Sequence, residues 1–246
     1  MKSTNETGHA KNVANFEDLI SFCTAYGPSY NPSKTTITIA GLTHLFEDAQ
    51  AKIAKVTSAK SDFDIVTGAR QTKFATLKPL ATRIINALSA TDALDTVVKD
   101  AKTINRKIQG GRASSKIVKS TEQSPEAKPT TTISVAQQSY DRLLDNLHQL
   151  IDLVSAETNY NPNEVELIVA NLNGYHSELK MANTTVITKH TTYSNARIER
   201  NAILYTAANS LVETAFNVKK YVKSVFGATS PQYKQISSLE FTKPNL

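Results

Sequence analysis

The sequence predicts an all-α protein, built as a tandem duplication of a long-helix antiparallel bundle module with three to four helices per copy. The chain of 246 residues contains 8 Gly and no Trp. Few Gly and many Ala favour long helices over a sandwich, which needs frequent turns. Apolar residues recur at alternating steps of three and four over long stretches, a spacing typical of helices packed side by side. In addition, the second half of the chain is similar to the first.

The internal similarity is found when the chain is compared with itself at a shift of about 130 residues. Residues 15–22 (NFEDLISF) fall on residues 146–153 (NLHQLIDL), and the Tyr-Asn-Pro triplet at 30–32 falls on the one at 160–162. The same shift pairs Arg70 with Arg200. One shift, with small slips in predicted loops, indicates a duplication.

The duplication divides the chain into four parts. They are a polar N-terminal segment (1–12), a first helical bundle repeat (13–110), a basic polar linker (111–132) and a second helical bundle repeat (133–246). Polar residues, two Pro and a Ser/Thr run mark the linker. Two separate bundles and one shared bundle both remain open.

Each repeat is predicted to begin with a helix, over about 13–25 and about 135–157. In the Tyr-Asn-Pro turn that follows, the asparagine is a good N-cap, and the proline suits the first helical position. These residues are Asn31 with Pro32, and Asn161 with Pro162.

The apolar seam then runs from Ile39 to Leu88, and from Val169 to Val225. Thr and Ser cluster near the middle of each seam and weaken helix propensity. We therefore expect a bend near 57–62 and near 187–192, with a continuous helix as the alternative.

Proline and glycine mark the later helices. Pro79 predicts a kink in the third helix of the first repeat. Asp92 is the expected N-cap of a fourth helix that Gly110 ends. In the second repeat, Gly227 ends the long helix, and a last helix starts at Ser230 and the proline that follows it.

Four stretches carry a resemblance to a known family: GHAKNVANFEDLISF, YNPSK, SNARIERN and FGATSPQYKQISSLEF. Together they resemble an uncharacterised family of helical-repeat proteins from Bacteroidota, over nearly the whole chain. The resemblance implies the helical architecture and a bacterial source. It implies no activity and no catalytic residues.

Charge is unevenly distributed. The chain carries a net charge of +6, and residues 99–128 hold eight basic and only three acidic side chains. Such a segment could neutralise several phosphates, giving weak, salt-dependent nucleic-acid binding. It contains no aromatic residue to stack on bases, so a solvated linker is the simpler interpretation. The candidate contacts are Lys102, Arg106, Lys107, Arg112, Lys116 and Lys119.

Arg70 and Arg200 both lie on the apolar seam. The favoured interpretation is that each fixes helix register by pairing across the bundle or lying at its edge. The alternative is a site for an anion or an acidic peptide. Cys23 lies in an apolar run and is interpreted as a small core residue.

No motif for catalysis or metal binding is present. His44 with Glu47 and Asp48 is the nearest approach to a metal-binding pattern, but its order is reversed relative to di-iron bundles, and the second repeat lacks an equivalent. We therefore expect no metal, no cofactor and no enzyme activity.

The predicted function is that of a non-enzymatic helical scaffold or protein-interaction protein, acting through an unknown protein partner or self-association. Weak nucleic-acid binding through residues 99–128 is the alternative. A membrane-active bundle or an enzyme without a recognisable motif comes third. The chain has no apolar signal-like or membrane-spanning stretch, so a cytoplasmic location is expected.

Overall fold

The computed structural model describes residues 4–110 and 138–244, and these residues are helical with no strand among them. The predicted all-α class is confirmed. The helices are α1 (Thr4–Ala25), α2 (Ile39–Ala75), α3 (Leu77–Ser89), α4 (Asp95–Gln109), α5 (Tyr140–Ala156), α6 (Val169–Asn201), α7 (Leu211–Phe226) and α8 (Pro231–Ser237). Short 3-10 turns occupy residues 27–29, 35–37 and 165–167, and a π-helix spans Ala202–Thr206.

The expected bends at 57–62 and 187–192 are wrong, because α2 and α6 run straight through both positions as continuous helices. Threonine hydroxyls there donate to carbonyls one turn back instead of breaking the helix, as Thr57 does to Ile53 and Thr192 to Thr188. Polar side chains at these positions also find partners, as Lys189 does by donating to Asp62 at 2.7 Å.

The described residues form two compact units that do not follow the expected boundaries at 13–110 and 133–246. Unit 1 combines residues 1–64 with residues 188–246, and unit 2 spans residues 65–187. Each unit therefore takes chain from both predicted repeats. The cause is the continuity of α2 and α6, since each helix begins in one unit and ends in the other.

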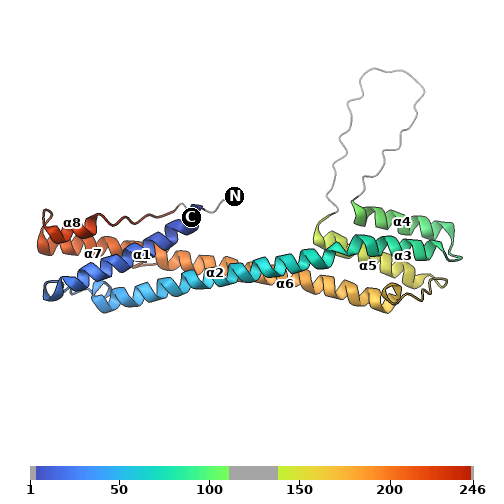
Figure 1. The fold of residues 1–246 in the computed structure, drawn as a ribbon, viewed down its shortest axis with the longest axis horizontal. Helices are drawn as coiled ribbons and strands as arrows, with labels where there is room; N and C mark the ends of the chain where they lie inside the picture. Colours follow the sequence, from blue (N-terminus) through green and yellow to red (C-terminus); the bar gives the residue numbers. More distant parts are fainter. Residues whose placement is uncertain (1–3, 111–137, 245–246) are drawn as a thin grey trace, which may run out of the picture. The chain divides into compact units, whose positions relative to one another are not determined.

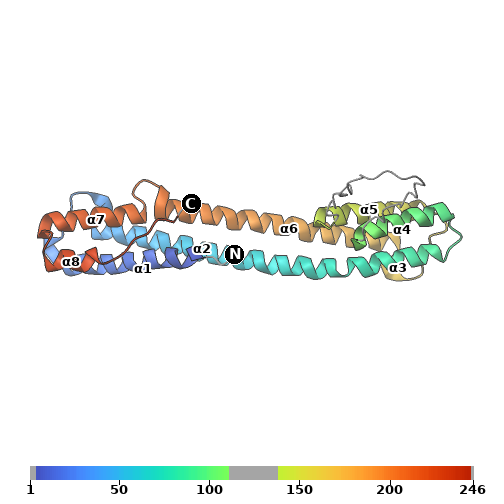
Figure 2. The same cartoon turned by 90° about the horizontal axis from the view of Figure 1, so that it is seen from above.

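Unit 1 contains α1, the first part of α2, the last part of α6, α7 and α8. Figure 2 shows α1, α7 and α8 gathered along the first part of α2. Fully buried apolar side chains from several of these helices share one core, among them Phe16, Leu42, Val218 and Ile236. Cys23 is 1% exposed in the same core, so its interpretation as a core residue is confirmed.

Unit 2 contains the last part of α2, α3, α4, α5 and the first part of α6. Helix α4 packs against both α3 and α5 (Figure 1). Leu77, Ile84, Leu147 and Leu172 are fully buried in the core of this unit.

The Tyr-Asn-Pro turns do not start helices, so the predicted N-cap roles of Asn31 and Asn161 are wrong. In unit 1 the buried Tyr30 hydroxyl donates to the Ile37 carbonyl at 2.5 Å. This contact closes a compact turn, so α2 begins only after Thr38, whose hydroxyl accepts the Gly41 N–H. Unit 2 has the same turn before α6, where the Tyr160 hydroxyl donates to the Leu167 carbonyl at 3.0 Å.

The glycines at 110 and 227 and the serine at 230 mark helix ends as expected. Pro79 lies in the first turn of α3 and kinks no helix, because α2 already ends at Ala75, whose carbonyl a proline four residues later would meet. Gly110 ends α4 in the left-handed conformation, with φ +80°. The hydroxyl of Ser230 caps α8, as expected.

Two further ends concern α4 and α7. Asp92 is not an N-cap, because α4 starts at Asp95 with Leu94 in the cap position. Gly227 follows the last residue of α7 and has φ +88°.

Candidate functional site

Arg70 lies in unit 2, between α2, α5 and α6. Its Nη1 donates to Oδ1 of Asn183 at 2.8 Å, and its guanidinium carbon lies 3.9 Å from the centre of the Tyr140 ring. Nδ2 of Asn183 in turn donates to Asp141 at 2.7 Å. The guanidinium thus connects the start of α5 to the facing helices.

Arg200 lies in unit 1 and is 2% exposed. Its Nε and Nη2 donate to Oδ1 of Asn201 at 3.1 and 2.9 Å. An anion in solvent cannot reach an arginine side chain that is buried to this extent. The two arginines that the sequence paired therefore differ in setting: Arg70 is half-buried in a three-helix contact, and Arg200 is fully buried.

A buried polar cluster connects α1 to the π-helix and the C-terminal segment of unit 1. Nδ1 of His9 lies 2.6 Å from the Tyr205 hydroxyl, and Nδ2 of Asn12 donates to the same oxygen at 3.2 Å. Asn12 also bonds the backbone of Thr242 in both directions, donating at 2.8 Å and accepting at 3.1 Å. A hydrogen-bonded cluster of this kind fixes how the elements of unit 1 pack together. Sequence reasoning missed it, because its members lie far apart in the chain.

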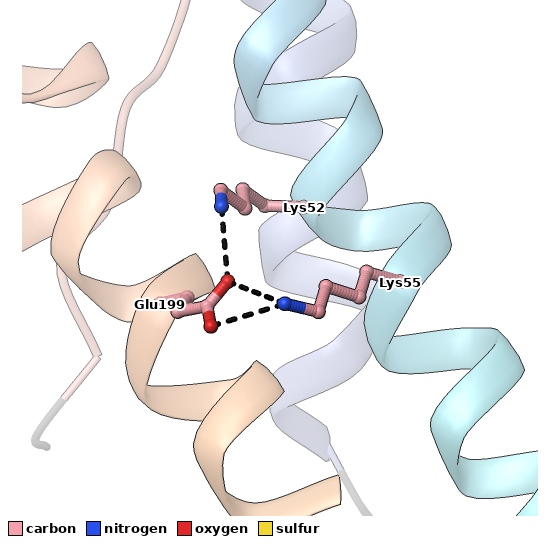
Figure 3. Close-up of polar contacts among 3 residues, drawn as sticks. All are labelled: Lys52, Lys55 and Glu199. Carbon is pink, nitrogen blue, oxygen red and sulfur yellow. Dashed lines mark hydrogen bonds and ion pairs between the residues drawn. The ribbon is translucent and has the colours of Figure 1, made fainter. Parts of the chain in front are cut away.

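Glu199 on α6 bridges two lysines of α2 within unit 1. Lys52 and Lys55 each donate to its carboxylate at 2.9 Å, and Lys55 makes a second contact at 3.0 Å (Figure 3). These bonds, from Lys55 first and then Lys52, lower the pKa of the Glu199 carboxyl to about 2. The charges tie the two long helices to each other.

The candidate nucleic-acid contacts fall partly on α4. Lys102, Arg106 and Lys107 are exposed there, and the first two lie one turn apart on one face. The other three, Arg112, Lys116 and Lys119, lie outside the described residues.

Histidines pair locally. His44 contacts Asp48 at 3.3 Å, one turn away on α2. In unit 2, His148 stacks on His176 with ring centres 5.3 Å apart. Burial, and then the nearby His148, lower the pKa of His176. In residues 4–110 and 138–244 no group of three or more His, Cys, Asp or Glu side chains is placed to hold a metal ion.

Unit 2 has an open pocket of about 440 Å³ between α3 and the turn that precedes α6. The turn contributes Tyr160, Asn161 and Leu167, and α3 contributes Ala87 and Asn86. Sequence reasoning missed this pocket. The repeated Tyr-Asn-Pro triplet was the only available signal, and it indicated a helix start.

No protein-family model, curated protein or solved structure matches the chain. The resemblance to a Bacteroidota family stays a prediction. None of the helices among the described residues combines the length and apolar character needed to cross a bilayer.

Proposed function

We propose that the protein is a non-enzymatic helical scaffold that binds another protein or itself. The observation that carries the proposal is the use of charge between helices. Glu199 accepts from lysines of α2, Asp62 accepts from Lys189, and Arg70 donates to Asn183. These polar groups are engaged in holding long helices together, as a frame requires, and they do not converge on the open pocket of unit 2.

We further infer that the chain is a tandem duplication, with a bacterial source and a cytoplasmic location as the accompanying expectations. The two Tyr-Asn-Pro turns support the duplication, since each buried tyrosine donates to the carbonyl seven residues later. On this proposal, each unit combines the first half of one repeat with the second half of the other. Such an exchange resembles domain swapping between two copies of a shorter ancestor.

The test uses the full chain, tagged and exposed to an extract of its source organism. A captured protein is then purified and titrated against the chain. The expected result is a complex of fixed stoichiometry that forms with purified components. Failure of every captured protein to bind in purified form, with a chain that sediments only as a monomer, would overturn the scaffold proposal.

Weak nucleic-acid binding is the second candidate, favoured by the exposed Lys102, Arg106 and Lys107 on α4. Replacing all three by Gln should reduce the slope of log affinity against log salt concentration by about 2 to 3, if each meets one phosphate. The matched control replaces three exposed lysines elsewhere by Gln: Lys34, Lys180 and Lys220. An equal loss in both variants would show only a general charge effect.

A further inference from the structure

In unit 1, a tyrosine of α7 packs against the Tyr-Asn-Pro turn. The Tyr221 ring meets the Tyr30 ring edge-on, with centres 5.3 Å apart. The backbone N–H of Asn31 donates to the Tyr221 hydroxyl at 3.2 Å. The turn of unit 1 thus binds a phenolic ring of the chain itself, through one ring contact and one hydrogen bond.

The equivalent position in unit 2 holds an alanine. Buried residues of α3 match buried residues of α7 at a constant difference of 134 in residue number. The matched pairs are Leu77 with Leu211, Ala81 with Ala215, Ile84 with Val218, and Leu88 with Val222. By the same difference, Tyr221 corresponds to Ala87.

Ala87 lines the pocket of unit 2, together with Tyr160 and Asn161. These two residues are the counterparts of Tyr30 and Asn31, which hold the Tyr221 ring in unit 1. The pocket therefore lies where unit 1 has a phenolic ring. Its volume of about 440 Å³ falls within the range of about 300 to 1,000 Å³ common for ligand pockets.

We propose that this pocket binds a phenolic ring, supplied by a tyrosine side chain of a partner polypeptide. The ring packs on the edge of Tyr160, and its hydroxyl accepts the Asn161 N–H. Asn86, Thr91 and Glu164 also line the pocket and provide polar groups for the peptide backbone of the partner. That a partner protein supplies the ring rests on the proposed scaffold function. That the pocket binds a phenolic ring does not depend on that function.

The first experiment titrates the full chain with p-cresol, the side chain of tyrosine without its backbone, and follows backbone amide signals by NMR. We expect the largest shifts at Ala87 and Asn161 and their neighbours. Ala87→Tyr should weaken p-cresol binding at least tenfold, because the new ring fills the pocket. Ala75→Tyr, at an exposed position of α2 outside the pocket, is the matched control and should bind as the parent does.

A second variant covers the case in which Ala87→Tyr does not fold. Tyr221→Ala removes the internal ring and should create a second p-cresol site at the turn of unit 1. Added p-cresol should then raise the melting temperature of Tyr221→Ala more than that of the parent. Toluene, which has the same ring without the hydroxyl, should bind more weakly than p-cresol at both sites.

Shifts scattered over the surface, p-cresol binding unchanged by Ala87→Tyr, or equal binding of toluene would each overturn the ring site. If Ala87→Tyr abolishes p-cresol binding and leaves a reconstituted partner complex intact, the partner tyrosine is overturned and the scaffold function stands. If no partner is found, the scaffold function fails, and the p-cresol results still decide whether the ring site exists.

Discussion

Replacing Arg70 by methionine tests whether this seam arginine holds the helices of unit 2 in register. The guanidinium donates to Asn183 at 2.8 Å and lies 3.9 Å from the Tyr140 ring centre. A hydrogen bond involving a charged group contributes about 1.5 to 3 kcal/mol. A cation–π contact contributes about 0.5 to 1 kcal/mol where it is partly exposed.

Two effects reduce the loss. Methionine retains much of the apolar contact of the arginine stem. In addition, Nε of Arg70 is buried with no hydrogen-bond partner among the described residues, and removing it relieves that cost. We therefore expect Arg70→Met to lower the free energy of unfolding by about 1 to 3 kcal/mol.

Equilibrium urea denaturation, followed by far-UV circular dichroism, measures this change. A loss of 2 kcal/mol moves the midpoint by about 1 M at the urea slopes common for small proteins. The control is Arg142→Met, at an exposed position of α5, which should shift the midpoint little. An unchanged midpoint for Arg70→Met, together with loss of binding to an anion or acidic peptide, would refute the register role and favour the ligand site.

Three further predictions concern the ion pairs, the cysteine and the composition of the units. Because the Glu199 pKa is lowered to about 2, its ion pairs stabilise the fold above the usual carboxyl pKa of 4.5, and this contribution is lost as pH falls toward 2. In urea midpoints measured between pH 6 and pH 3, Glu199→Gln should therefore show a smaller drop than the parent, and equal drops would contradict the prediction. Burial raises the pKa of Cys23 to about 12, so a thiol reagent at pH 8 should label the folded protein slowly and the urea-unfolded protein fast; rapid labelling of the folded chain would show that this part of unit 1 opens readily. Cleavage at a protease site inserted after residue 124 should leave two fragments that co-elute on gel filtration, because each unit contains helices from both fragments. Separate elution of the fragments would show that each repeat forms its own bundle.

Much of the helical plan could be predicted from local sequence. The three-and-four spacing of apolar residues predicts the long helices, since a helix buries one face at that period. The prediction of a polar segment over 1–12 outside the helices is wrong, because α1 begins at Thr4. Gly110, Gly227 and Ser230 mark helix ends because left-handed backbone and side-chain capping are local properties. Pro79 indicates an interruption of the helix for the same reason, and the interruption lies between Ala75 and Leu77 instead of within the third helix.

Other features depend on contacts that the residue types alone do not specify. The threonine clusters suggested a bend in each long helix, but the packing of α2 beside α6 and their ion pairs hold both helices continuous. The Tyr-Asn-Pro turns resembled helix starts, and only the bond from Tyr30 to the Ile37 carbonyl shows how the chain closes there. The ion pair of Lys189 with Asp62 joins residues 127 positions apart, and the bond from Tyr30 to Ile37 needs a turn conformation that the residue types alone do not specify.

The helical class and the helix ends at Gly110, Gly227 and Ser230 follow from apolar period, propensity and capping, which are local properties. The similarity of the two halves is likewise visible in the residues alone. The folded chain, in contrast, is needed to tell which helices share a unit. The composition of each unit depends on whether α2 and α6 fold back or continue as single helices. Contacts between side chains of distant segments determine this. The folded structure also shows that the space next to Tyr160 is open, whereas the matching space next to Tyr30 is filled by the Tyr221 ring. This difference between Ala87 and Tyr221 becomes visible only when each residue is seen packed against its turn.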